Sequence, residues 1–447
     1  MTEWTSNWAA ATRVAMSAAL LALLSASAVG QVRWHVDASA TPGGDGSTWA
    51  NALDSVNVAL SNSTMGDEIW VKAGTYTAGD PTDVNDPRSA TFSVPVGVPL
   101  RGGFDGTEVS LDQRAGLFSQ TILTGDLGQL GVINDNAYHV VTAHFGSGVP
   151  PAPTTVDGFT IRDGNANSAG NTQGGGVWMF NAGLWISNCI IRDNYATHGA
   201  GLHGQPAAVR MRWCEFIDNH ARERGGALWG QAINYKISHT IFRGNTADKG
   251  GAIFLTSIGA TSGELPIVLV HNSLFYDNAA RRGGAILLGG FWGASGKATF
   301  SSCTIAYNTA REGGGGSWAN TGSQIPAESY FYNSIVWHNT APVNPNLHGR
   351  HGGIACNFQD GTFYGAGNIM VDPLFVDGPN RDLRLLTGSP SVDTGSNAMV
   401  PRDFVDVNGD GNFHDPQTLD LDRQRRIVNH PSAPSTGRVI DMGAFEL

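Results

Sequence analysis

Oxygen-bearing side chains alternate with other residues in the segment DVNGDGNFHD near the C-terminus. Their spacing matches the first, third, fifth and seventh positions of an EF-hand-like calcium loop, and Gly411 stands at the sixth, where the chain must turn sharply. The twelfth position normally supplies a bidentate carboxylate but is Gln417, so Asp415 or Asp420 would have to replace it. The predicted calcium ligands are Asp406, Asn408, Asp410, Asn412 and Asp415. The alternative is an Asx-rich surface turn without a metal.

Charged residues recur at two fixed places in a repeated motif. The basic set, which directly precedes a glycine corner, is His198, Arg224, Lys249 and Arg282, and the acidic set, which directly precedes an asparagine, is Asp193, Asp218 and Asp277. Like charges stacked about 4.8 Å apart repel one another, so neighbouring columns of opposite sign would stabilise each other. The two sets form either a solvated corner with exchanging ion pairs or a groove for an acidic or neutral glycan.

Large aromatic residues follow the glycine corners of the same repeats, at Trp178, Trp229, Phe254 and Trp318. If exposed, such a row would offer a platform for carbohydrate or protein, and if buried it belongs to the core. We expect the core, and we keep Trp229 beside the charged sets as a candidate ligand-binding residue.

The repeat that positions these residues is marked by asparagines at intervals of 25 to 33 residues. They are Asn165, Asn194, Asn219, Asn245, Asn278, Asn308 and Asn339. Five residues before each of the last six stands a small residue, such as Cys189 or Ser273, and three before stands a large apolar one, such as Phe216. Separate small and large columns at even spacing indicate inward-facing positions of one strand in a stacked array.

We therefore predict an all-β parallel β-helix solenoid with an N-terminal helical cap. The buried asparagines form a ladder, in which each amide bonds the corner backbone and the asparagine of the next coil. Glycine pairs such as Gly225-Gly226 close tight corners, and no leucine pattern or helix per repeat supports a leucine-rich horseshoe. Cys189 and Cys214 share a column, about 4.8 Å apart, so we expect buried thiols, with a disulfide as the alternative.

The ends of the chain differ from the repeat. The predicted divisions are an export signal at 1–28, an N-terminal cap and first coil at 32–80, β-helix coils at 81–395, and a calcium-loop tail packed on the last coil at 396–447. The apolar run Val14–Ala28, followed by small residues, indicates the signal, with an uncleaved anchor as the alternative. Trp49, Leu53, Val56 and Leu60 fall at helical spacing, and a helix there would cover the open first coil.

The composition limits the classes of function. A formal net charge of −11 argues against a broad basic surface for nucleic acid. The 59 glycines and the 41% of hydrophobic residues fit a turn-rich β protein with a core rather than a disordered chain. We expect a secreted or cell-surface monomer without a transmembrane segment in the mature chain.

A recurring pair of short motifs resembles the repeat of bacterial polymorphic outer-membrane proteins, over roughly Gly158 to Gly353. The pairs are FIDN with GGAL, FRGN with GGAI, and FYDN with GGAI. The resemblance implies a right-handed parallel β-helix of the pectate-lyase-like type, and those proteins are surface adhesins. The C-terminal part of the chain looks like the end of the chains in the choice-of-anchor Q family, whose members carry varied surface-anchoring signals. The resemblance lies in the segments DPLFVDGPNRDLRLLTGSPSVDTGS and VIDMGAFEL. Because no sorting signal precedes Leu447, we expect release, or attachment through another component.

The expected function is non-catalytic, the presentation of a repetitive face to polysaccharides or other macromolecules. The alternative is a polysaccharide lyase or a glycoside hydrolase. Lyases of this fold use an arginine base with Ca²⁺, and hydrolases use two carboxylates about 5–5.5 Å or 6.5–9.5 Å apart. No motif in the sequence fixes a particular arginine or aspartate in such a role.

Overall fold

The computed structural model describes residues 31–144, 152–205, 208–232, 234–257, 267–290, 297–320, 327–360, 365–407, 409, 411–428 and 439–447. The predicted export signal at 1–28 lies outside these residues. The chain divides into two compact units, Met1–Val32 and Arg33–Leu447, and the second unit is described below. Among the described residues, no helix is long and apolar enough to cross a membrane.

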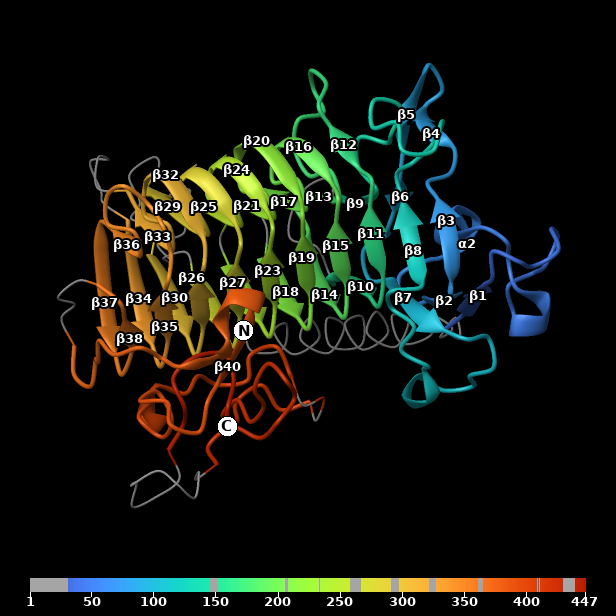
Figure 1. Ribbon diagram of the computed structural model, residues 1–447. Coiled ribbons are helices and arrows are strands. Elements are labelled where there is room, and N and C mark those ends of the chain that lie inside the picture. Colours follow the sequence, from blue (N-terminus) through green and yellow to red (C-terminus); the bar gives the residue numbers. More distant parts are fainter. Residues whose placement is uncertain are drawn as a thin grey trace, which may run out of the picture. The chain divides into compact units, whose positions relative to one another are not determined.

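Four parallel sheets, here numbered I to IV in chain order within a coil, build the second unit (Figure 1). Sheet I contains β1 (Arg33–Val36), β2 (Glu68–Lys72), β7 (Pro99–Phe104), β10 (Thr154–Asp157), β14 (Gly183–Ser187), β18 (Ala208–Arg212), β22 (Asn234–Ser238), β26 (Ile267–His271), β30 (Lys297–Ser301), β34 (Glu328–Tyr332) and β37 (Arg350–Ile354). Sheet II contains β3 (Gly74–Thr77), β8 (Thr121–Thr124), β11 (Thr160–Arg162), β15 (Ile190–Arg192), β19 (Glu215–Ile217), β23 (Ile241–Arg243), β27 (Leu274–Tyr276), β31 (Thr304–Ala306), β35 (Ile335–Trp337) and β38 (Asn357–Phe358). Sheet III contains β12 (Asn165–Ala166), β16 (Tyr195–His198), β20 (His220–Arg224), β24 (Thr246–Lys249), β28 (Ala279–Arg282) and β32 (Thr309–Gly313). Sheet IV contains β6 (Phe92–Ser93), β9 (Val141–His144), β13 (Val177–Phe180), β17 (Leu202–Gln205), β21 (Leu228–Ala232), β25 (Ile253–Ser257), β29 (Ile286–Gly290), β33 (Ser317–Ala319) and β36 (Leu347–His348).

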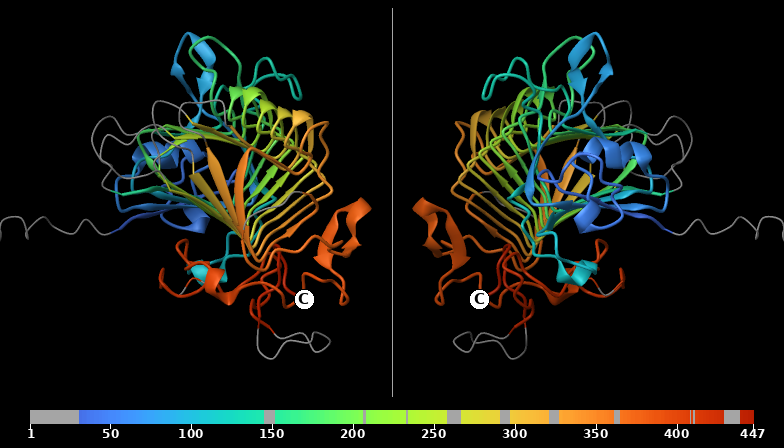
Figure 2. Two further views of the ribbon diagram at one scale, coloured as in Figure 1. Left: turned by 90° about the vertical axis from the view of Figure 1, so that its left-hand side faces the viewer. Right: turned by 90° about the vertical axis from the view of Figure 1, so that its right-hand side faces the viewer.

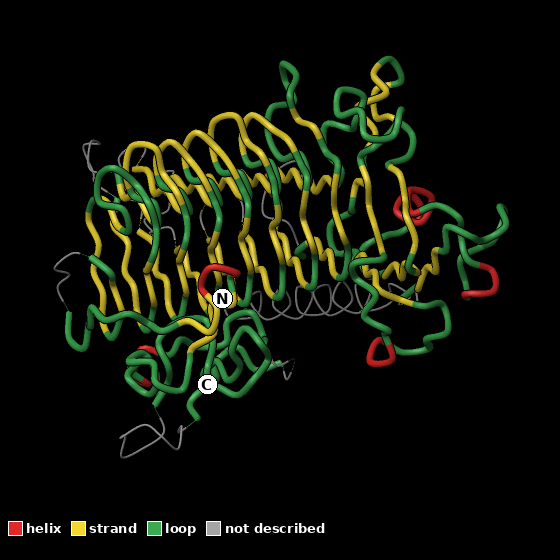
Figure 3. Tube along the Cα trace, in the orientation of Figure 1, coloured by secondary structure: helices red, strands yellow, loops and turns green. Residues whose placement is uncertain are grey.

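Each regular coil visits the four sheets once and then starts the next coil beside itself, as the end-on views of Figure 2 show. Because every strand in these sheets pairs in parallel with the equivalent strand of the next coil, the fold is a right-handed parallel β-helix, as predicted. Figure 3 shows how little helix accompanies the strands. Two small antiparallel pairs stand apart, β4 (Pro81–Asp83) with β5 (Asp86–Ala90) and β39 (Phe375–Asp377) with β40 (Asp382–Leu385).

The predicted asparagine ladder is confirmed at the corner between sheets II and III. The amide of Asn194 donates to Asn219 Oδ1 at 3.0 Å, and the same contact continues from Asn219 to Asn245 and upward to Asn339. The ladder ends on Asn346, at 2.9 Å from Asn339, which the repeat spacing did not indicate. The start of the ladder was predicted wrongly, because Asn165 pairs with Tyr195 and the backbone N–H of Gly164 takes the place of the first rung.

Side chains that point into the coils form one continuous core. Phe216, Phe242 and Phe275 stack with ring centroids 5.2 and 4.7 Å apart, as their shared column predicted. Cys189 and Cys214 are buried free thiols, and Cys189 donates to the carbonyl oxygen of Ser187 at 3.2 Å. The thiol expectation is therefore confirmed, and no disulfide joins this pair.

The predicted single helix at the N-terminal end is divided in two. A 3-10 turn covers Trp49–Asn51 and α2 covers Val56–Asn62. Between them the chain is held extended, because Leu53 N–H donates to His35 and its carbonyl accepts from Asp37. The apolar face of α2 still packs on the first coils, since Val56, Ala59 and Leu60 join the main core.

The C-terminal tail was predicted on the last coil, and this placement is wrong. The tail runs back along the corner between sheets I and II and contacts several earlier coils. Asn333 donates to Ser396 O at 3.0 Å, Asn272 donates to Gln417 Oε1 at 2.8 Å, and Arg212 donates to Val405 O at 3.1 Å. In the structure the tail is the segment that follows β38, which starts before the predicted 396 and includes the 3-10 turns Gly378–Asn380 and Asn397–Met399. A further 3-10 turn, Leu111–Gln113, lies in the connection between β7 and β8.

Candidate functional site

The predicted basic column is assembled along sheet III. His198 pairs with Arg224, Arg224 with Lys249, and Lys249 with Arg282, each on the next coil. Trp229 lies beside this column, in the outward row of sheet IV. The structure thus brings together five of the eight residues that the sequence placed in a ligand-binding groove.

Guanidinium groups cover the aromatic row of sheet IV. Arg224 lies 5.7 Å from the ring centroids of both Trp229 and Phe254, and Arg282 lies 5.2 Å from that of Trp318. Trp229 and Phe254 are only 3% and 6% exposed. The expectation of buried rings is therefore confirmed for these two residues, and they offer no open platform for a sugar.

The acidic column lies at the other edge of sheet III. Asp193, Asp218 and Asp277 each occupy the left-handed corner between sheets II and III, at φ of 55°, 52° and 53°. Asp277 pairs with Arg381 of the tail at 2.7 Å, and Arg282 of the basic column pairs with Glu312. Among the described residues no ion pair joins the two columns, so the expected mutual stabilisation is wrong.

Histidine adds no charge to the basic column at neutral pH. Burial, together with the positive charge of Arg224, lowers the pKa of His198 to about 4. Burial also lowers the pKa of the neighbouring His203 to about 3. The column's charge therefore comes from Arg224, Lys249 and Arg282.

The predicted calcium loop is only partly described, because Asn408 and Asp410 lie outside the described residues. Gly411 N–H donates to Asp406 Oδ1 at 3.1 Å. Gln417 is buried and donates to Ser238 Oγ at 2.8 Å, and Asp420 accepts from the backbone of Gln424 and Glu446. Gln417 therefore fastens the tail to β22, and Asp420 is engaged within the tail.

A cleft of about 300 Å³ opens on the outer face of sheet I beside the tail. Its residues include Arg101, Asp157, Trp185, Ser187, Arg210, Arg212, Val405, Asp406 and Phe413. The floor comes from β14 and β18, whose outward side chains alternate with core residues such as Ile186 and Met211. The sequence reasoning missed this cleft.

Arg210 holds a positive charge in the middle of the cleft. Its guanidinium lies 5.1 Å from the ring centroid of Trp185 and 5.1 Å from that of Phe413. Burial lowers its pKa, although an arginine still remains charged. Lys236 is its register partner on the next coil, and neither cation has an ion-pair partner among the described residues. Two adjacent unpaired cations attract an anion.

Asp157 fixes one wall of the cleft. The carboxylate accepts from Arg114 Nη1 at 2.8 Å, Asn188 Nδ2 at 2.7 Å and Ser187 Oγ at 2.9 Å, and Arg101 lies 3.3 Å away. Burial alone would raise its pKa, but these partners hold the pKa below its usual value. Asp157 is therefore an ionised structural group that tightens the cleft rather than a proton donor.

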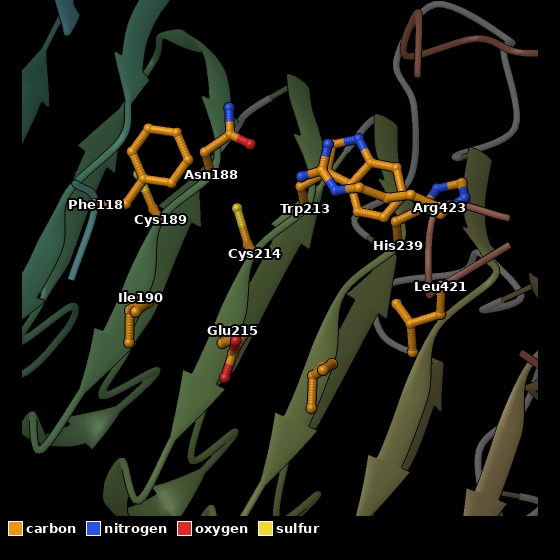
Figure 4. A pocket seen from close by; sticks show the side chains of 11 residues that line it. Phe118, Asn188, Cys189, Ile190, Trp213, Cys214, Glu215, His239, Leu421 and Arg423 are labelled. Atoms are coloured by element: carbon orange, nitrogen blue, oxygen red, sulfur yellow. The ribbon is translucent and has the colours of Figure 1, made fainter. Parts of the chain in front are cut away.

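A second cavity, of about 260 Å³, lies around the corner from the cleft (Figure 4). Phe118, Ile190, Ile241 and Leu421 give it apolar walls, while Glu215 and Arg423 supply opposite charges. The guanidinium of Arg423 lies 4.0 Å from the ring centroid of Trp213. We call this cavity the corner pocket.

One signal in the sequence could have indicated the cleft. Trp185, Arg210 and Lys236 occupy the same place in three successive coils, where polar or charged residues alternate with core residues. The tail residues Phe413 and Arg423 could not have been placed, because their contacts depend on how the tail runs back along the coils.

Comparisons with known proteins agree with the fold. Residues 239–256 match the family described as the Chlamydia polymorphic membrane protein repeat, which confirms the predicted repeat for this part of the chain. The segment covers β23, β24 and all but the last residue of β25, which are three sides of one coil. No curated protein sequence matches the chain.

Two solved structures show a weak similarity to the chain. A crystal structure of pectate lyase Pel9A is 14% identical, with a TM-score of 0.43, and the match covers 94% of this chain and 98% of that one. A structure of a pectin methylesterase variant in complex with a hexasaccharide is 11% identical, with a TM-score of 0.30, and the match covers 75% and 92%. The fold assignment rests on the strand pairing of this chain.

Proposed function

We propose that the protein is an exported, monomeric binding protein for acidic polysaccharides, and that the cleft on sheet I is its binding site. The observation that carries this proposal is Arg210, held between the rings of Trp185 and Phe413 without an ion-pair partner among the described residues. A guanidinium pairs with a carboxylate or sulfate in two-pronged fashion, and an exposed indole stacks on the apolar face of a sugar ring. Export is the expectation drawn from the N-terminal segment.

The charge around the cleft supports an acidic ligand although the whole chain is acidic. Arg212 donates to the tail backbone at Val405 and lies 4.0 Å from Asp406, so it lines the cleft in a fixed position. Arg210 and Lys236 have no such counter-charge among the described residues. A concave site with surplus positive charge raises the local concentration of an anionic chain.

Calorimetric titration of the full chain with oligosaccharides of polygalacturonate tests this function. Trp185→Ala and Arg210→Ala should each weaken binding roughly tenfold, which corresponds to about 1.4 kcal/mol. Tyr330→Ala is the matched control, because Tyr330 lies in the same outward row of sheet I and is 36% exposed, against 41% for Trp185. Arg311→Ala is the control for lost charge. Equal losses in variants and controls, or no binding by the wild-type chain, would refute the proposal.

A polysaccharide lyase is the second candidate, and one observation favours it. Burial lowers the pKa of Arg210, which is the direction that a guanidinium acting as a base would need, although the group stays charged in the free protein. Incubation with uronate polysaccharides, followed by ultraviolet absorbance of unsaturated products and by counting new reducing ends, tests this activity. Arg210→Ala should abolish such products, and their absence with the wild-type chain across neutral and alkaline pH would exclude the lyase.

We further propose that calcium binds the tail loop through Asp406, Asn408, Asp410, Asn412 and Asp415. The support is the spacing of oxygen ligands and the turn of Gly411 toward the Asp406 carboxylate. Because Asp406 and Phe413 also line the cleft, calcium would stiffen one of its walls. Metal analysis of dialysed, calcium-loaded protein should give one calcium per chain, and Asp406→Asn should remove it.

A further inference from the structure

The cleft and the corner pocket lie on the same two coils. Ser187 lines the cleft and the next residue, Asn188, lines the pocket, and Arg212 and Trp213 divide in the same way on the following coil. The two cavities therefore occupy opposite sides of one corner, between sheets I and II. A chain that follows the strands across this corner would meet first the cleft and then the pocket.

The tail lines both cavities, and the β7 to β8 connection lines the pocket and supports the cleft. From β10 onward, two residues join sheet I to sheet II in each coil, whereas the β7 to β8 connection runs from 105 to 120. That connection brings Phe118 to the pocket, and Arg114 from the same connection bonds Asp157 in the cleft. On the opposite side, the tail supplies Phe413 to the cleft and Leu421 to the pocket.

The polar groups of the corner pocket are those that an amide needs. Glu215 can accept a hydrogen bond and Arg423 can donate one, and neither has an ion-pair partner among the described residues. Asn188 and His239 are already engaged, the first by Asp157 at 2.7 Å and the second by Leu419 O at 3.0 Å. The rest of the lining is mostly apolar, as Figure 4 shows around Ile190 and Leu421.

We propose that cleft and pocket are two subsites of one transverse groove, and that the ligand combines an acidic sugar with an N-acylated amino sugar. The acidic sugar lies on Trp185 and Arg210 in the cleft. The acyl group of the other sugar enters the pocket, where its amide N–H donates to Glu215, its carbonyl accepts from Arg423, and its methyl group contacts Ile190. This inference rests on the proposed binding of acidic polysaccharides in the cleft.

Glu215 also explains why the two subsites would take different sugars. A uronate in the corner pocket would bring its carboxylate to Arg423 but also against Glu215, where like charges repel, whereas an amide satisfies both groups. A sugar that bears only hydroxyl groups would leave the apolar wall without a partner. From Trp185 to Ile190 the floor crosses the corner in five residues, at most roughly 17 Å of chain because it turns at Asn188, so the groove suits a short oligosaccharide.

Three oligosaccharide probes of equal length separate the possibilities in calorimetric titrations of the full chain. Hyaluronan oligosaccharides alternate an acidic sugar with an N-acetylated one, polygalacturonate is acidic only, and chitin oligosaccharides are N-acetylated only. We expect hyaluronan to bind about tenfold more tightly than polygalacturonate, and chitin to bind more weakly than both. Glu215→Ala should reduce the tenfold preference to about twofold. Glu223→Ala, which removes an exposed carboxylate of sheet III, should retain it.

Each outcome decides between the two proposals. If polygalacturonate binds as tightly as hyaluronan, the two-subsite groove is wrong and the acidic-glycan function stands. If neither acidic probe binds, both proposals are wrong. Tight binding of chitin alone would overturn the acidic subsite and the further inference with it. Circular dichroism of each variant ensures that a loss of preference does not come from unfolding.

Discussion

Asn245→Ala removes one rung from the middle of the buried ladder. The Asn245 amide donates to Phe216 O, Arg243 O and Asn278 Oδ1 at 2.9 to 3.1 Å, and its oxygen accepts from the backbone and the side chain of Asn219 at 3.1 and 3.0 Å. The NH2 group has two hydrogens for three acceptors, so one of them is shared, and the variant loses about four full hydrogen bonds at a site that is 0% exposed. At about 1 kcal/mol for each bond, we expect a loss of roughly 4 kcal/mol of stability.

Asn346→Ala provides the internal comparison, because Asn346 ends the ladder. It accepts from the backbone and side chain of Asn339 at 3.2 and 2.9 Å, so its removal costs two bonds, or about 2 kcal/mol. Asn62→Ala, at the exposed end of α2, should change stability by less than about 0.5 kcal/mol.

Urea denaturation followed by circular dichroism measures the order of the three variants. Hydrogen exchange shows whether the coils around β23 loosen first, since a solenoid does not always unfold in one step. The reasoning is refuted if Asn346→Ala destabilises as much as Asn245→Ala, or if both cost less than about 1 kcal/mol.

Three further predictions concern acid, glycine corners and thiols. Burial lowers the pKa values of His239 and His271, which face the tail, to about 3. Because these values lie below the unfolded pKa of about 6.5, the stability of the protein should fall as pH drops from about 6.5 toward 3. His271→Phe should flatten that dependence in denaturation curves measured at pH 7 and pH 5. In thermal melts, Gly225→Ala should destabilise the protein by more than about 2 kcal/mol, because at φ of 59° the added Cβ would collide with Leu228 O. Gly131→Ala is the control: at φ of 79° its Cβ meets open space, so it should show only the smaller backbone strain. Burial raises the pKa of the Cys189 thiol to about 12. A thiol-specific chromogenic reagent should therefore label Cys189 and Cys214 no faster than the protein unfolds. Rapid labelling of the native protein would contradict their buried placement.

The sequence predicts the scaffold well because the repeat constrains it locally. An asparagine, a small residue and a large apolar residue at fixed spacing must face inward on each coil, so the Asn219 and Phe242 columns could be placed without a structure. The sequence places Asn165 in the ladder column, but in the structure Asn165 lies one position after that column and pairs with Tyr195. Its amide instead donates to Ile133 O, in a loop whose course the repeat does not determine. The split before α2 was missed for a similar reason, since Leu53 is held by His35 rather than by its helical neighbours.

The candidate site was harder to predict because half of it comes from outside the repeat. The basic residues fall in one register column of sheet III and the acidic residues at its corner with sheet II, but the groups that neutralise them, such as Arg381 and Glu312, lie on the tail and on a later coil. Gln417 was noted only as a poor calcium ligand, whereas its side chain bonds Asn272, 145 residues away. Long-range contacts of this kind carry no periodic signal.

The position of the groove follows from where the coils vary in length. Asn194 and Asn219 are 25 residues apart and Asn219 and Asn245 are 26 apart, the two shortest intervals of the repeat, so the coils that carry Arg210 and Lys236 have little insertion to cover them. The β7 to β8 connection lies on one side of these two coils, and the tail closes over the corner on the other side. The cleft and the corner pocket therefore lie between the β7 to β8 connection and the tail. Its inward residues build the coil, and its outward residues, Trp185, Arg210 and Glu215, are free to differ from one coil to the next. Ligand specificity in such a fold depends on the outward positions of the shortest coils together with the segments that border them.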